Sequence, residues 1–224
     1  MRTKAVLFDL FETLMTEWGH KKYTKSEMSS DLGVDQALFN QCWDENEQKR
    51  YLGEIDFTDS IRYACERCGK AIDSATLDAV MEKRVLTKSA CFHYVHQEVY
   101  QLLEKLKGMG LKTAMVSNCS AEEVEGISES KLYPFFDQTI LSYQVGLQKP
   151  DSRIYHRAAD LLEVAPEECI FVGDGGSNEL EGARNAGMRA VQAKWYTNQL
   201  PYRRESIPGF SVAEEPLVVL DFIV

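Results

Sequence analysis

Long apolar runs are missing from this chain of 224 residues. A membrane-spanning helix needs about 18 or more consecutive apolar residues, and no stretch of the sequence approaches that length. The residues Met1 to Lys4 precede an apolar run that is too short for the hydrophobic region of a signal peptide. We therefore expect a cytoplasmic protein without a membrane partner.

Basic residues are also in short supply. The 25 lysines and arginines stand against 35 aspartates and glutamates, which gives a formal net charge of -10. Nucleic acids and anionic membranes attract cationic surfaces, so this balance argues against both as main partners. A small anionic metabolite, held by a few local cations, remains compatible with it. The oligomeric state has no recognisable signature in the sequence.

Cysteines number six, and their scatter suggests no disulfide framework. A chain of this length can bury a sizeable core without cross-links, so reduced thiols are expected. The one close pair is Cys65 and Cys68. A zinc site could combine this pair with Cys91, His93 and His96. No second close pair stands at the spacing of a zinc finger, so two helix-borne thiols near a core are the favoured interpretation.

Short apolar runs rich in β-branched and aromatic residues recur along the chain and predict buried strands. They are Ala5 to Phe8, Thr113 to Val116, Thr139 to Tyr143, Cys169 to Val172 and Ala190 to Ala193. Helical patterns lie between the later runs. This alternation predicts an α/β fold, with a Rossmann-like parallel sheet covered by helices on both faces. The apolar tail Pro216 to Val224 is expected to form a closing edge strand.

Residues 18–91 interrupt this alternation. The segment has helical periodicity, as in Leu38, Phe39, Cys42 and Trp43, and it contains no convincing strand. We predict a small all-helical cap domain inserted after the first strand. Residues 1–17 and 92–224 would then form the Rossmann-like catalytic core.

Polar residues follow the predicted strands at the points where a ligand would bind. In an open parallel sheet, ligands bind outside the carboxyl ends of the strands. Asp9, Ser117, Asn118 and Asp174 directly follow apolar runs, and Lys149 comes a few residues after another. Each residue alone is an ordinary turn or helix-cap residue. Their significance lies in the combination.

Together these side chains form a chemical set suited to phosphoryl transfer. Two neighbouring carboxylates suit Mg²⁺, which prefers oxygen ligands, and a carboxylate can also act as a nucleophile. Lys149 would supply positive charge to an anionic substrate and to its transition state. Ser117 and Asn118 would add neutral donors. Positioning and charge neutralisation of this kind perform most of the catalysis in phosphoryl transfer.

Four ordered motifs in the sequence resemble those of the haloacid dehalogenase superfamily. They are Phe8 to Leu14, Val116 to Asn118, Gln148 to Asp151, and Val172 to Asp174 with Glu179 five residues on. The similarity covers roughly Lys4 to Lys194, and the helical segment lies where many members carry a cap. The resemblance implies a magnesium-dependent hydrolase, most simply a phosphatase acting on a small phosphate monoester. It does not identify the substrate.

The resemblance also implies roles for individual residues. Asp9 would be the nucleophile and a metal ligand, together with the backbone carbonyl of Phe11 and with Asp174. Glu179 would orient metal-bound water, although the usual family residue near this position is Asp. Ser117, Asn118 and Lys149 would bind the substrate, and Ser117 and Lys149 would hold the transferring group.

Phe11 departs from the pattern of the family phosphatases, which usually place a second Asp there as general acid and base. Losing a positioned proton donor typically costs about 10²- to 10⁴-fold in rate. Glu12 or a group from the helical segment could replace it.

The departure at Phe11 keeps two other functions open. The 2-haloacid dehalogenases carry Tyr at this position and need no metal, and Tyr155 fits that branch as well. Asp174 argues against it, because a retained acid beside Asp9 without a cation would suffer like-charge repulsion. A catalytically weak regulatory or binding protein is the other alternative. The intact Asp9, Lys149 and Asp174 count against it, since a retired site has no physical need for buried charges.

Overall fold

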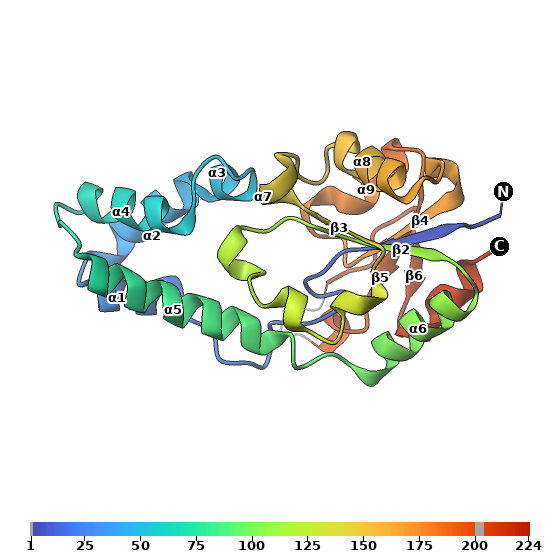
Figure 1. Ribbon diagram of the computed structural model, residues 1–224, viewed down its shortest axis with the longest axis horizontal. Coiled ribbons are helices and arrows are strands. Elements are labelled where there is room, and N and C mark those ends of the chain that lie inside the picture. Colours follow the sequence, from blue (N-terminus) through green and yellow to red (C-terminus); the bar gives the residue numbers. More distant parts are fainter. Residues whose placement is uncertain (1, 200–203) are drawn as a thin grey trace.

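A six-stranded parallel sheet forms the centre of the computed structural model, which describes residues 2–199 and 204–224 (Figure 1). The strand order is β3-β2-β1-β4-β5-β6. The strands are β1 (Ala5–Phe8), β2 (Lys112–Ser117), β3 (Gln138–Leu141), β4 (Cys169–Gly173), β5 (Arg189–Ala193) and β6 (Ser211–Ala213). Every neighbouring pair is parallel, so the predicted sheet is confirmed.

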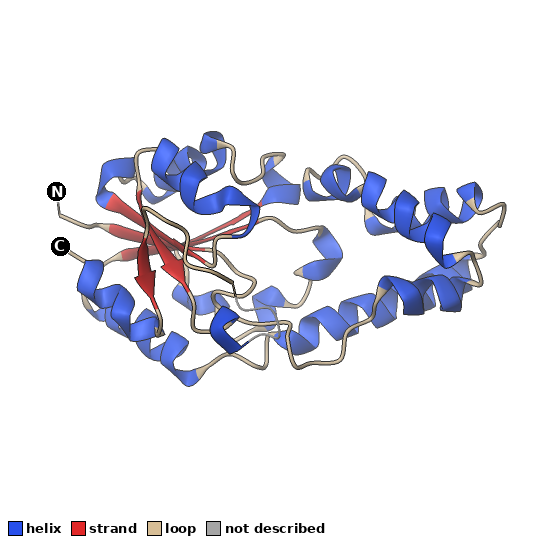
Figure 2. Ribbon diagram, turned by 180° about the vertical axis from the view of Figure 1, so that it is seen from behind, coloured by secondary structure: helices blue, strands red, loops and turns tan. Residues whose placement is uncertain are grey.

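Helices cover both faces of this sheet, because successive side chains of each buried strand point to opposite sides. In β1, Val6 and Phe8 join the core that includes α6 (Gln97–Gly108), whereas Ala5 and Leu7 join the core that includes α8 (Ser152–Leu162) and α9 (Glu179–Asn185). Figure 2 shows the strands between these two layers of helices. The predicted α/β architecture is therefore confirmed.

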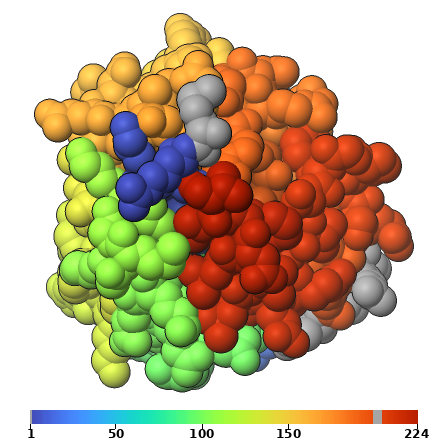
Figure 3. Space-filling model, turned by 90° about the vertical axis from the view of Figure 1, so that its right-hand side faces the viewer, coloured from blue at the N-terminus to red at the C-terminus, as the bar shows by residue number. Residues whose placement is uncertain are grey.

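The C-terminal tail differs from the prediction. Residues Pro216–Phe222 form a 3-10 helix, and β6 supplies the edge strand instead. Proline suits the first turn of a helix, and the buried Pro216 and Val219 lie three residues apart, which is one turn of a 3-10 helix. The expected closing strand was therefore wrong. The Thr3 amide donates to the Val224 carbonyl at 2.6 Å, so the segment before β1 and the C-terminal segment lie side by side (Figure 3).

The third strand is also shorter than expected. It ends at Leu141, and the short helix α7 (Ser142–Val145) follows directly. Tyr143, which was predicted to continue the strand, therefore belongs to a helix. The backbone carbonyl of Tyr143 lies so close to Gly53 that a Cβ on Gly53 would stand 2.1 Å from it. This contact joins α7 to residues 18–91.

Residues 18–91, called the helical segment below, contain five helices and no strand. The helices are α1 (Lys25–Leu32), α2 (Gln36–Glu45), α3 (Glu47–Tyr51), α4 (Phe57–Arg67) and α5 (Ser74–Cys91). Thr24, Asp56 and Asp73 cap the first turns of α1, α4 and α5. The helices enclose their own apolar cluster, and Figure 1 shows them to one side of the sheet. Among the described residues, no helix has both the length and the apolar character required to cross a bilayer.

Buried charges connect the helical segment to the rest of the chain. From α5, Arg84 and Lys88 each lie 2.9 Å from the carboxylate of Glu123, and Lys88 also pairs with Glu17. Burial alone would raise the pKa of Glu123, but the two cations hold it at about 2. This arrangement places the Lys88 ammonium 5.2 Å from the centre of the Phe11 ring.

Candidate active site

The point where the strand order reverses defines the site. From β1 the chain passes to β2 and β3 on one side, and it then returns to place β4 on the other side of β1. A crevice opens at such a switch point, outside the carboxyl ends of the two adjacent strands. Asp9 directly follows β1 and Asp174 directly follows β4, so the fold brings the two predicted carboxylates together.

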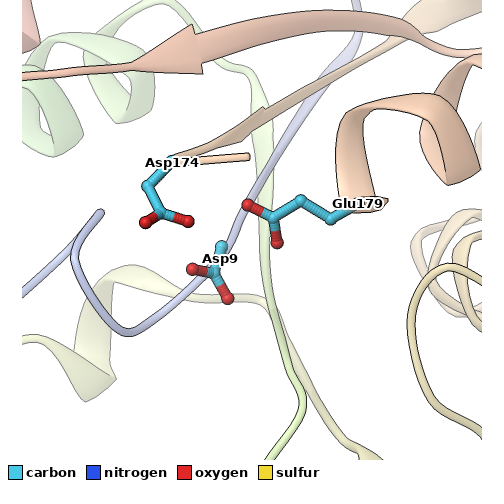
Figure 4. Close-up of side chains that lie close together, drawn as sticks. All are labelled: Asp9, Asp174 and Glu179. Atoms are coloured by element: carbon cyan, nitrogen blue, oxygen red, sulfur yellow. The ribbon is translucent and has the colours of Figure 1, made fainter. Parts of the chain in front are cut away.

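Three buried carboxylates form one group at this switch point. Ligand atoms of Asp9, Asp174 and Glu179 all lie within 4.8 Å of one another. Figure 4 shows their carboxylates converging, with Glu179 at the start of α9. In residues 2–199 and 204–224, no other cluster of three or more His, Cys, Asp or Glu ligands occurs, and the six cysteines are free. The alternative zinc site around Cys65 and Cys68 is therefore not formed.

Lys149 lies between two members of this group. Its Nζ atom is 2.5 Å from Asp9 Oδ1 and 2.5 Å from Glu179 Oε2. Burial opposes the charge on this fully enclosed ammonium, but Asp9 and Glu179 outweigh the burial and raise the pKa of Lys149. The side chain is therefore a fixed cation in direct contact with Asp9.

Asn118 holds the backbone of Lys149 in place. The Lys149 amide donates to Asn118 Oδ1 at 2.7 Å, and Asn118 Nδ2 donates to the Lys149 carbonyl at 2.9 Å. This reciprocal pair ties the loop after β2 to the segment that carries Lys149. The contacts observed for Asn118 thus position Lys149.

Ser117 ends β2, next to β1, and is fully buried. Among the described residues its Oγ atom has no hydrogen-bond partner. Such a buried hydroxyl normally finds a partner, because an unsatisfied one costs about 1–3 kcal/mol. An anion bound beside Asp9 and Lys149 would supply the missing acceptor.

The carboxylate group carries more negative charge than its neighbours offset. Burial and the charge of Asp9 raise the pKa of Asp174, and the same causes raise the pKa of Glu179 to about 8. Lys149 and the half-exposed Arg204, which lies 3.2 Å from Asp174 Oδ2, are the cations paired with these acids. An excess of converging, buried carboxylate oxygens fits a hard divalent cation such as Mg²⁺.

Gly173 makes the close packing of this group possible. A Cβ on Gly173 would lie 2.2 Å from Glu179 Oε1, so any side chain would displace that carboxylate. The same oxygen accepts a hydrogen bond from the Gly175 amide at 3.0 Å, while Asp174 Oδ1 accepts one from the Gly176 amide at 2.8 Å. The glycine-rich turn after β4 therefore orients both acids.

Sequence reasoning assigned no role to several residues around the site. The Thr13 hydroxyl donates to Asp9 Oδ2 at 3.4 Å; its place four residues after Asp9 was an available signal. Arg204 lies outside every motif, so the sequence contained no signal that could have identified it. Tyr155, considered above as a dehalogenase residue, is fully buried behind the site, where its hydroxyl donates to the Glu179 carbonyl at 2.7 Å.

The residues after Asp9 take an unusual course. Glu12 has a φ of 58°, in the left-handed region that favours glycine. Its carboxylate accepts hydrogen bonds from the Thr16 hydroxyl at 2.6 Å and from the Glu17 amide at 3.0 Å. Glu12 therefore closes the turn after Phe11, whose half-buried ring packs beneath Lys88.

Comparison with known proteins places this geometry in a family. The family model described as haloacid dehalogenase-like hydrolase matches residues 3–187. The chain belongs to this family of hydrolases. The resemblance seen in the four motifs is thereby confirmed.

Relatives within the haloacid dehalogenase-like family carry different names. The chain is 30% identical to a glyceraldehyde 3-phosphate phosphatase of Methanopyrus kandleri, over 98% of this chain and 97% of that protein. Its fold resembles a HAD phosphatase from Thermococcus onnurineus, with a TM-score of 0.68 at 20% identity, covering 98% of this chain and 97% of that one. It also resembles a 2-haloacid dehalogenase from Pseudomonas syringae, with a TM-score of 0.69 at 18% identity and the same coverage. At such identities the two structures support the fold alone.

Proposed function

We propose that the protein is a magnesium-dependent phosphatase that acts on a small phosphorylated metabolite through the carboxylate of Asp9. The observation that carries the proposal is the contact of Lys149 with Asp9 beside a converging group of buried acids. A relative that aligns along nearly the whole chain is named as a phosphatase, which supports the same reaction class.

The metal ligands in this proposal are Asp9, Asp174, Glu179 and the backbone carbonyl of Phe11. When bound, a divalent cation there would neutralise charge on the phosphoryl oxygens. Ser117 would donate its unpartnered hydroxyl to one of those oxygens, and Lys149 would stabilise their charge in the transition state. Asn118 would hold the backbone of Lys149 in place through its hydrogen bond with the Lys149 amide.

The reaction would proceed in two steps. An oxygen of Asp9 attacks phosphorus, the bond from phosphorus to the leaving oxygen breaks, and an aspartyl-phosphate forms. Water then attacks this phosphorus and restores the Asp9 carboxylate while phosphate departs. The helical segment would act as a cap that limits access of bulk water during both steps. This division into cap (18–91) and core (1–17 and 92–224) is part of the proposal.

A direct comparison of products tests the assignment. Phosphate release from small phosphate compounds and halide release from a 2-haloacid should be measured with Mg²⁺ and with a chelator. We expect metal-dependent phosphate release and no halide release. Metal-independent halide release would instead favour the dehalogenase function that the aromatic Phe11 keeps open. Absence of both products would favour a non-catalytic binding role.

Removing the metal should make stability depend on pH. The pKa of Glu179 in the folded protein is about 8, above its ordinary 4.5, so the folded state retains a proton that the unfolded chain loses. Without a cation, stability should therefore fall as pH rises from about 4.5 to about 8. At about 100 times its Kd, Mg²⁺ should stabilise the fold by about 2.7 kcal/mol, or roughly 5–10 °C in Tm, and most strongly at the alkaline end.

Thermal unfolding at pH 6 and pH 8.5, with Mg²⁺ or a chelator, measures this effect. Glu179→Gln is the matched control, because it keeps the shape of the side chain and removes its titration. The variant should lose most of the pH dependence seen in chelator. An equal decline in the wild type and the variant would contradict the assignment to Glu179.

A further inference from the structure

A leaving group that departs as an alkoxide needs a proton, and the surroundings of Asp9 determine which groups could provide one. The observed side-chain contacts of Asp9 are with Lys149 and Thr13, and its carboxylate neighbours are Asp174 and Glu179. Each of these groups has another function in the site. A proton donor for the leaving group must therefore come from elsewhere or be missing.

The neighbours of Asp9 are poorly suited to donate a proton. Lys149 is bound by two carboxylates at 2.5 Å, and both ion pairs favour its charged form. Asp174 and Glu179 converge on the proposed cation, which requires their ionised forms. The hydroxyl of Thr13 already points its proton at Asp9.

The groups beyond Asp9 on the side of the helical segment are engaged as well. Both carboxylate oxygens of Glu12 accept hydrogen bonds from the turn that follows it. Lys88 binds Glu17 and Glu123 and faces the ring of Phe11. Phe11 itself presents only hydrocarbon. None of these three side chains is a free acid, and residues 200–203 read Leu-Pro-Tyr-Arg, without a carboxylic acid or a histidine.

We infer that the natural substrate is an activated phosphate, in which the leaving oxygen belongs to a carboxylate or to another phosphate. This inference rests on the proposed phosphatase function and narrows its substrate class. Asp9 attacks phosphorus, the bond to the leaving oxygen breaks, and the leaving group takes the electron pair and departs as a carboxylate or phosphate anion. Such anions are stable near neutral pH, since their conjugate acids have pKa values of about 4–6, against about 16 for water. No protein acid is then required.

Phe11 is then the residue that determines the preference for activated phosphates over alkyl phosphates. With hydrocarbon at this position, an alkyl phosphate would have to expel an unprotonated alkoxide. A positioned acid typically accelerates such a step about 10²- to 10⁴-fold, and its absence should exclude alkyl phosphates to that extent. Activated phosphates would be little affected.

A series of small substrates tests the inference. The value of kcat/KM should be measured for acetyl phosphate, pyrophosphate, phenyl phosphate and ethyl phosphate. This quantity reports the step in which the leaving group departs, whereas hydrolysis of the shared aspartyl-phosphate affects kcat alike for all of them. We expect ethyl phosphate to be slower than the best activated substrate by at least about 10²-fold. Acetyl phosphate releases a carboxylate and pyrophosphate releases a phosphate, so comparing the two shows which leaving group the site prefers.

Three variants test whether the missing acid, and not another property of the site, causes slow turnover of ethyl phosphate. Phe11→Asp should raise kcat/KM for ethyl phosphate by up to about 10²-fold relative to kcat/KM for acetyl phosphate. Phe11→Asn removes the same ring without adding an acid and should give no such gain. Glu12→Gln should leave the ratio between the two substrates unchanged.

Several results would overturn the inference and leave the phosphatase proposal intact. They are equal wild-type turnover of ethyl and acetyl phosphate, an equal gain from Phe11→Asn, or a loss from Glu12→Gln confined to ethyl phosphate. If no member of the series were hydrolysed in an Asp9-dependent manner, the proposed function itself would fail.

Discussion

Replacing Asp9 with asparagine is expected to reduce metal-dependent phosphate release by about 10⁴-fold or more, as loss of a catalytic nucleophile does in other hydrolases. An amide has nearly the shape of a carboxylate, but it carries no negative oxygen to attack phosphorus. The substitution also removes one of the two anions that contact Lys149. Rates of phosphate release for the purified wild type and variant measure the effect directly.

The control for Asp9→Asn must show that the activity is lost because the nucleophile is missing and not because the protein unfolds. Asp160→Asn makes the same change at an exposed position of α8, away from the site, and should retain the wild-type rate. The Asp9 variant should keep a cooperative thermal transition, because Lys149 still pairs with Glu179. A folded Asp9→Asn protein that kept a tenth of the activity would rule out the carboxylate as nucleophile.

The sequence predicted the sheet and the residues at its carboxyl edge because both follow from local pattern and topology. Short β-branched runs alternating with helical periodicity require a parallel sheet, and polar residues that end such runs must meet at one edge. Asp9, Ser117 and Asp174 lie where this argument places them. Lys149 follows its strand by eight residues, so its contact with Asp9 depends on the fold around Asn118.

Features that depend on tertiary contacts were not predictable in this way. The tail has the composition of a strand, yet Pro216 and Val219 are buried with a period of three. Glu12 follows the nucleophile closely, but only its positive φ and its bonds to the next turn show that it closes a loop. Arg204 reaches Asp174 from thirty residues away in sequence. None of these three features has a recognisable pattern in the sequence.

Lys149→Met is expected to impair both activity and stability. The Lys149 ammonium would stabilise the transition state, and it also neutralises two buried acids of the folded protein. Without it, the charge that develops on the phosphoryl oxygens loses a fixed partner, and losing such a group costs about 10²- to 10³-fold in kcat. Asp9 and Glu179 would also be left as buried acids without their counter-ion. Removing one partner of a buried ion pair destabilises a protein by about 3–5 kcal/mol.

The two effects of Lys149→Met should respond differently to Mg²⁺. A divalent cation among the remaining carboxylates would neutralise them, so it should restore much of the stability that urea unfolding shows to be lost in chelator. It should not restore the rate, because the metal would occupy the acidic side of the site and leave the substrate without the ammonium. Lys112→Met, at the opposite end of the sheet, is the matched control and should change neither the rate nor the response to Mg²⁺. If Lys149→Met were as stable as the wild type in chelator, the ion pairs with Asp9 and Glu179 would not contribute to folding, and Lys149 could not be regarded as the fixed cation of the site.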